Sequence, residues 1–348
     1  MKSERLLSLD AFRGATIASM ILVNNPGSGK DVYPPLEHAT WNGWTFTDLV
    51  FPFFLWIAGV SMTLSFARRG GEPKTLLLHT LRRAAMIFLI GLALNGFPKY
   101  NFSTIRIPGV LQRIAVCYLI ASVIFLYTKW RGQAVAAGGL LLVYGLLMGG
   151  NFDKETNFAR YVDGLVLSGH MWSSTKVWDP EGVVSTLPAI ATVLFGILAG
   201  HILGLARTSA EKAAWMFTGG AVMLWAGSLL ELVMPINKSL WTSSYSVFMA
   251  GMAMVVFGCF YWLIDGNGYQ RWSRPLVVYG MNAIAMFVLS GLVARLLSLT
   301  GVRKPLYDAV FAPLASPINA SLLWAITYVL LFYGIAWVLY QKKVFVKL

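Results

Sequence analysis

Charged residues are scarce in this chain, at 12% of its 348 residues. Soluble domains carry about twice that fraction, so the composition argues against an ordinary soluble protein. The chain has only four histidines and two cysteines. It has no HExxH or CxxC spacing, so no metal site is expected, and no Walker or GxGxxG phosphate loop. Cys117 and Cys259 both fall inside apolar segments, which favours filling of the core over a disulfide.

Apolar residues, by contrast, make up 57% of the chain, and the mean hydropathy is +0.64. Runs of about 20 apolar residues can cross a hydrocarbon core of roughly 30 Å. These runs predict an all-α polytopic membrane protein with about ten transmembrane helices in one bundle, forming a single domain over residues 1–348. The helices are expected at 10–24, 48–67, 79–96, 109–128, 133–150, 186–206, 213–234, 244–264, 275–298 and 319–340.

The distribution of basic residues predicts the orientation. If the N-terminus is cytoplasmic, most of the 28 basic residues lie in short loops on the cytoplasmic side. Both termini are therefore expected in the cytoplasm. The net charge of +13 indicates topology and attraction to anionic lipid, and nucleic acid is not expected as a partner. Asp10 and Arg13 interrupt the first apolar run, so a cleavable signal peptide is not expected.

One histidine, His38, lies in a polar loop between two strongly apolar segments, and the charge distribution places this loop outside. The segments 96–113, 151–185 and 235–243, expected on the same side, also mix charge or amide groups with Trp and Pro. Function concentrates in such loops. Together they predict a polar, aromatic-lined cap that suits a sugar, although an interfacial aromatic belt would explain many of the Trp and Tyr residues.

Several short motifs, in the same order along the chain, resemble the heparan-α-glucosaminide N-acetyltransferase family. They are RLLSLDAFRG at 5–14, LVNNPG at 22–27, HATWNGWTFTDLVFPFFLWIAGVS at 38–61, RIPGVLQRIA at 106–115, DPEGVVSTLPAI at 179–190, PINKSLWTSSY at 235–245 and YGMNAI at 279–284. LDAFRG alone also opens other membrane acyltransferases, whereas HATWNG together with DPEG and PINKSLW is specific. The chain resembles a short bacterial, NagX-like member of the family.

The resemblance implies an acetyl-CoA-dependent amino-sugar N-acetyltransferase of the bacterial cytoplasmic (inner) membrane. Acetyl-CoA would act as co-substrate from the cytoplasm, and the amine of a glucosamine-type sugar would accept the acetyl group on the outer side. The family's essential histidine matches His38, and its companion asparagine matches Asn24. The lysosomal relative forms a dimer, which suggests a homodimer here.

Imidazole, with an unperturbed pKa of about 6.5, suits a general base near neutral pH. His38 would take a proton from the attacking amine or carry the acetyl group transiently as acetyl-histidine; both remain open. Asn24 is the candidate donor to the developing oxyanion. Asp48 either caps the second helix or orients His38, and capping alone explains its position.

For the donor, we expect positive charge near the phosphates. Arg13, Arg82 and Arg83 are the candidates, although the positive-inside rule explains the last two and a buried pair with Asp10 competes for Arg13. Gln112 and Arg113 could line the transfer site. Asn282, expected inside the ninth helix, either faces the donor channel or packs against another helix.

For the acceptor, seven residues of the predicted outer loops are candidates. They are Trp41, Asn42, Asp179, Glu181, Asn237, Lys238 and Trp241. A carboxylate could hold an ammonium or a hydroxyl group, and Trp241 could stack on a sugar ring.

Two other functions stay open on the sequence. A proton-coupled transporter or flippase for an amino sugar or a lipid-linked sugar could use His38 and the intramembrane Glu231 as a proton relay. Lys238 would be the nearest basic partner of Glu231 along the chain. An O-acetyltransferase of a cell-envelope glycan is the second alternative.

Overall fold

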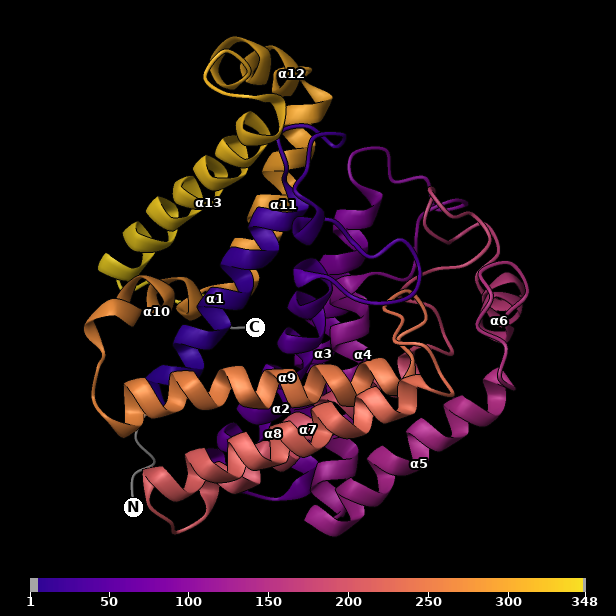
Figure 1. The fold of residues 1–348 in the computed structure, drawn as a ribbon, viewed down its shortest axis with the longest axis vertical. Coiled ribbons are helices and arrows are strands. Elements are labelled where there is room, and N and C mark those ends of the chain that lie inside the picture. The colour runs from indigo at the N-terminus through magenta and orange to yellow at the C-terminus, as the bar shows by residue number, and fades with distance from the viewer. Residues whose placement is uncertain (1–5, 347–348) are drawn as a thin grey trace.

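The computed structural model describes residues 6–346, and within that range every regular element is a helix (Figure 1). The longer helices are α1 (Leu7–Asn24), α2 (Phe46–Arg69), α3 (Pro73–Gly96), α4 (Val110–Tyr127), α5 (Trp130–Met148), α6 (Phe158–Val166), α7 (Thr186–Gly204), α8 (Ser209–Glu231), α9 (Ser243–Tyr261), α10 (Arg274–Met281), α11 (Ala283–Leu299) and α13 (Pro317–Gln341). The short ones are η1 (Pro34–Leu36), η2 (Trp262–Gly266), η3 (Arg271–Ser273), α12 (Arg303–Leu306) and η4 (Tyr307–Phe311).

The prediction of an all-α polytopic membrane protein is confirmed. Among residues 6–346, eight helices are long and apolar enough to cross a membrane, or nine if the bent pair of α10 and α11 counts as one span. The expected first span is present as α1. It carries Asp10 and Arg13 and is not among the eight.

The expected continuous helix at 275–298 is wrong, because the chain bends by 69° between α10 and α11. Asn282 lies at the break rather than inside a helix. Its side-chain amide donates to the Val344 carbonyl (3.1 Å), and its side-chain oxygen accepts from the Val346 N–H (2.8 Å). The Asn282 side chain therefore holds the segment that contains Val344 and Val346 against the break between α10 and α11.

The backbones of α1 and α10 touch at two glycines. A Cβ on Gly14 would lie 1.7 Å from the Leu276 carbonyl oxygen, and one on Gly280 would lie 1.9 Å from the Asp10 carbonyl oxygen. Any other residue would push the helices apart, so Gly14 and Gly280 fix the position of α10 on α1.

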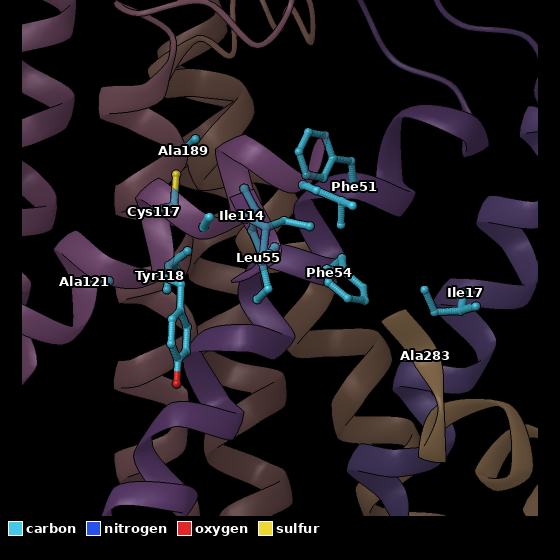
Figure 2. Packing of buried hydrophobic residues seen from close by; sticks show 14 of the residues in the cluster. Ile17, Phe51, Phe54, Leu55, Ile114, Cys117, Tyr118, Ala121, Ala189 and Ala283 are labelled. Carbon is cyan, nitrogen blue, oxygen red and sulfur yellow. The ribbon is translucent and has the colours of Figure 1, made fainter. Parts of the chain in front are cut away.

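The central helix of the core is α2, which packs along α7. Figure 2 shows the apolar layer in which Leu55 and Phe54 of α2 lie near Ile114 of α4, with Ile17 of α1 beyond Phe54. Cys117 fills this core, as expected. Cys259 does not, because it is exposed on α9.

Candidate active site

The N-terminus of α2 is capped by a carboxylate that also holds a histidine. Asp48 accepts hydrogen bonds from the backbone N–H groups of Thr45 (3.1 Å) and Ala39 (3.0 Å) through Oδ2. Its other oxygen, Oδ1, lies 2.6 Å from His38 Nδ1. Because an ionised carboxylate only accepts, Nδ1 carries the proton in this contact, which leaves the lone pair of His38 on Nε2.

A second loop brings a cation to the same place. The Gly43 N–H donates to the Ile236 carbonyl (2.7 Å), which docks the His38 loop against the loop that contains Lys238. Lys238 Nζ then lies 3.1 Å and 3.2 Å from the two ring nitrogens of His38, and 3.8 Å from Asp48 Oδ1. Burial lowers the pKa of Lys238 from its ordinary value, although Asp48 opposes the shift. His38, Asp48 and Lys238 thus form one contiguous group.

This group borders a cavity of about 480 Å³, which we call the His38 cavity. Among the expected site residues, it is lined by Asn24, His38, Trp41, Asp48, Glu181 and Lys238. The tryptophans Trp172 and Trp178 and the cations Arg106 and Lys154 line it as well. Six of the expected residues therefore line one cavity, together with four residues that were not singled out from the sequence.

One wall of the His38 cavity is built around Arg106. Its guanidinium donates to both oxygens of Asp179 (2.8 and 2.6 Å) and to Glu181 (2.5 Å), and it lies over the ring of Trp172. Burial alone would lower the pKa of Arg106, but the ion pairs with Asp179 and Glu181 raise it. The motif RIPGVLQR contains Arg106, but only this fold brings it to the DPEG turn.

The DPEG turn is held from behind by Asp163 of α6, whose carboxylate accepts from the backbone N–H groups of Asp179 (3.1 Å) and Val183 (2.9 Å). Asp179 is itself buried and does not line the His38 cavity. Its carboxylate is used by Arg106, by the Trp172 N–H (2.9 Å) and by the Glu181 N–H (3.0 Å). Asp179 therefore supports the wall of the His38 cavity, whereas Glu181 lines the cavity itself.

The structure gives three other acceptor candidates positions beside the cavity rather than in it. Asn237 is buried and joins the two loops through its amide, which donates to Asn42 (3.1 Å). Stacking of a sugar on Trp241 does not fit its position, because only 1% of this residue is exposed. Its indole donates to Thr192 (3.3 Å), and its ring meets Phe51 edge-on at 4.9 Å.

Gln112 and Arg113 are also buried, and neither lines the His38 cavity. Arg113 donates to the Gly182 carbonyl (3.1 Å) and to the Ser185 hydroxyl, and it lies over the ring of Trp241. The position of Arg113 fits a structural role, since it ties α4 to the start of α7.

Two adjoining cavities of about 310 and 570 Å³ lie at the other end of α2. They share Arg13, Ser61, Ser65, Arg69 and Met281, and together we call them the Arg13 cavity. Arg68 and Arg83 line it too, whereas Arg82 is exposed and does not.

Arg13 pairs with Asp10 (3.0 Å), and it also donates to Ser61 (2.7 Å). The expected pairing and a place in the cavity therefore coexist. The four guanidinium groups of the Arg13 cavity suit phosphate oxygens, which arginine binds through paired N–H donors.

Asn282 does not line the Arg13 cavity, but the segment that it holds does. Phe345 borders one part of the cavity and Val346 the other. Leu6 borders the same cavity as Phe345, so both ends of the described chain lie there.

Comparison with known proteins decides the family. The family model described as heparan-alpha-glucosaminide N-acetyltransferase, catalytic, matches residues 5–230. This chain belongs to that family. The heparan-alpha-glucosaminide N-acetyltransferase family model spans Arg13, Asn24, His38 and Asp48, and it ends before Lys238.

Two members of the heparan-alpha-glucosaminide N-acetyltransferase family resemble most of the chain. The Homo sapiens protein of that name is 28% identical over a gapped alignment of 411 positions, which covers 99% of this chain and 60% of the relative. The Mus musculus protein is 30% identical over a gapped alignment of 353 positions, which covers 82% of this chain and 53% of the relative. The chain therefore spans less than two thirds of the length of these relatives.

Proposed function

We propose that this protein is a transmembrane N-acetyltransferase that takes the acetyl group from acetyl-CoA in the Arg13 cavity and passes it to an amino sugar in the His38 cavity. The observation that carries the proposal is the placement of these two cavities at opposite ends of α2. One end offers guanidinium groups for phosphates, and the other offers an imidazole–carboxylate pair beside tryptophans. The Homo sapiens and Mus musculus relatives are both named heparan-alpha-glucosaminide N-acetyltransferase, which supports the same type of transfer here.

In the proposed reaction the amine nitrogen attacks the thioester carbonyl, the C–N bond forms, and the C–S bond breaks to release the CoA thiolate. His38 Nε2 accepts the proton that the amine loses and returns it to the departing sulfur, which leaves as the CoA thiol, while Asp48 keeps the other ring nitrogen protonated. A two-step route through acetyl-histidine uses the same Nε2 as the nucleophile.

Negative charge develops on the carbonyl oxygen during attack, so donors near His38 accelerate transfer. The amide of Asn24 lines the cavity and is assigned this role. Lys238 supplies a cation next to His38 and stabilises the same charge. Trp41 and Glu181 are assigned to the acceptor sugar, which would stack on the indole and bond to the carboxylate.

We place the Arg13 cavity on the cytoplasmic side of a bacterial inner membrane and the His38 loop outside. Leu6 and Phe345 border the same cavity, which supports a common side for the two termini. A homodimer is proposed from the family resemblance and is tested by light scattering of the purified protein in detergent.

The deciding experiment incubates the purified full chain with acetyl-CoA and glucosamine. We expect N-acetylglucosamine and free thiol in equal amounts, and loss of both in His38→Ala with acetyl-CoA binding retained. An alkali-labile ester product would indicate O-acetylation instead. Sugar uptake into proteoliposomes without consumption of acetyl-CoA would contradict the proposal in favour of a transporter.

The transporter has less support than the sequence suggested. Glu231 is exposed at the end of α8, and Lys238 engages His38 and Asp48. His38 therefore has a carboxylate partner other than Glu231.

A further inference from the structure

The His38 cavity and the Arg13 cavity share no lining residue. On α2, Phe51 lines the His38 cavity and Phe54 lines the Arg13 cavity. On α4, Val110 lines the His38 cavity and Ile114 lines the Arg13 cavity. The two residues of each pair are about one helical turn apart, which corresponds to roughly 5.4 Å along a helix. A layer about one turn thick therefore separates the two cavities.

The layer between the cavities is apolar. Ile17 of α1 joins Phe51, Phe54 and Ile114 in one buried cluster, and each of these four residues is at most 8% exposed. Figure 2 shows Phe54 between Leu55 of the same helix and Ile17 of α1. We call Ile17, Phe51, Phe54 and Ile114 the septum.

The two phenylalanines of the septum are held differently. The ring of Phe51 meets the buried Trp241 at 4.9 Å, and Arg113 lies over that tryptophan. No aromatic partner is found for Phe54 among residues 6–346, and this side chain borders the open space of the Arg13 cavity. Phe51 is therefore held by an aromatic contact that Phe54 lacks, and Phe54 is the septum phenylalanine that faces the Arg13 cavity.

We propose that Phe54 determines which acyl groups cross from the Arg13 cavity to His38. This inference rests on the proposed acetyl transfer and adds its selectivity. Phosphates cannot enter an apolar layer without losing their hydration, so the nucleotide end of the donor stays with the arginines. An acetyl thioester is short and uncharged, and it needs only the space that Phe54 vacates. Longer acyl chains collide with the ring.

The test compares acetyl-CoA, propionyl-CoA and butyryl-CoA as donors to glucosamine, with N-acyl products measured by mass spectrometry. For Phe54→Ala we expect the kcat/KM ratio of butyryl-CoA to acetyl-CoA to rise about 10-fold or more, since each methylene in an apolar site changes selectivity by roughly that factor. Phe54→Leu, a milder truncation, gives a smaller rise.

Phe53→Ala is the matched control. Phe53 is as buried as Phe54, but it packs against Phe12, away from the septum. The same truncation there should leave the ratio unchanged. An unchanged ratio in Phe54→Ala, or an equal rise in Phe53→Ala, overturns the assignment of Phe54.

A second readout needs no transfer activity. Ser65→Cys places a thiol in the Arg13 cavity, in a background in which the exposed native thiol is removed by Cys259→Ser. A small membrane-impermeant thiol reagent added on the His38 side should label it only when Phe54→Ala is also present. Equal labelling with Phe54 intact means that the septum does not exist. Absence of acetyl transfer in the unmodified protein refutes the proposed function instead, and the labelling result then decides the septum alone.

Discussion

His38 Nδ1 lies 2.6 Å from Asp48 Oδ1, and the other oxygen of the same carboxylate closes the first turn of α2. The orientation of the imidazole is thus tied to the start of a helix whose buried residues form the centre of the bundle. Asp48 is fully buried, whereas more than half of the His38 side chain is exposed. Asp48 is therefore the fixed member of the pair, and His38 is the member that reaches into the His38 cavity.

Asp48→Asn should reduce acetyl transfer strongly while the helix persists. The neutral amide keeps an oxygen for the Thr45 N–H but no longer favours the protonated Nδ1 and the lone pair on Nε2. We expect kcat to fall by about 10²–10⁴, the usual range for disabling a general base. Steady-state kinetics with glucosamine and acetyl-CoA measure the effect.

Thr45→Ala separates catalysis from capping. It removes the Thr45 hydroxyl, which donates to the Glu37 backbone carbonyl (2.5 Å) and lies 3.2 Å from Asp48 Oδ2, but keeps the backbone N–H that Asp48 caps. We expect a loss of about 1 kcal/mol in the free energy of unfolding and little change in kcat. If the two variants lose activity equally, Asp48 acts through the helix start and not through His38.

Local pattern was enough to predict most of the fold. Apolar runs of membrane-spanning length predicted the helices, because each must bury its own backbone polar groups in lipid. The break at Asn282 was missed, and the partners of Asn282 at the break, Val344 and Val346, lie more than sixty positions along the chain. The apolar pattern of residues 275–298 contains no information about those distant contacts.

The residues of the candidate site also fall into two groups, those that are close in the sequence and those that only the fold brings together. His38 and Asp48 lie ten positions apart, so the sequence placed them near each other and left only the choice between cap and partner. Lys238 lies 200 positions from His38, and its contact depends on the docking of two loops. Arg106 reaches Asp179 in the same non-local way. Trp241 was misjudged because its packing partners, Phe51, Thr192 and Arg113, also lie far from it along the chain.

Arg106→Met should destabilise the wall of the His38 cavity. It removes the partner of Asp179, whose side chain is fully buried, and an unpaired buried carboxylate is costly. We expect the free energy of unfolding to fall by about 3 kcal/mol. Arg160→Met removes the exposed pair with Glu155 and should cost less than about 1 kcal/mol. A loss in Arg106→Met as small as that in Arg160→Met, measured by thermal unfolding, would show that the ion pairs of Arg106 do not stabilise the wall.

The proposed orientation is tested by Thr40→Cys. Thr40 is exposed and lines the His38 cavity, so a membrane-impermeant thiol reagent should label it from outside intact cells or spheroplasts. A cysteine at Arg82, exposed near the opposite end of the bundle in the proposed topology, should react only in inverted vesicles. The reverse pattern would place His38 in the cytoplasm.

The neighbours Asn24 and Asn25 offer the sharpest division between chemistry and structure. Asn25 is buried and donates to the Ile21 carbonyl (2.8 Å), whereas Asn24 is exposed and lines the His38 cavity. Asn24→Ala should lower kcat by about 10²–10³, as loss of an oxyanion donor does, without lowering the melting temperature. Asn25→Ala should keep kcat and lose about 1 kcal/mol of stability. Kinetics and thermal unfolding of both variants are measured together. If activity depends on Asn25 and not on Asn24, the oxyanion role passes from Asn24 to another donor, and Lys238 is the next to test.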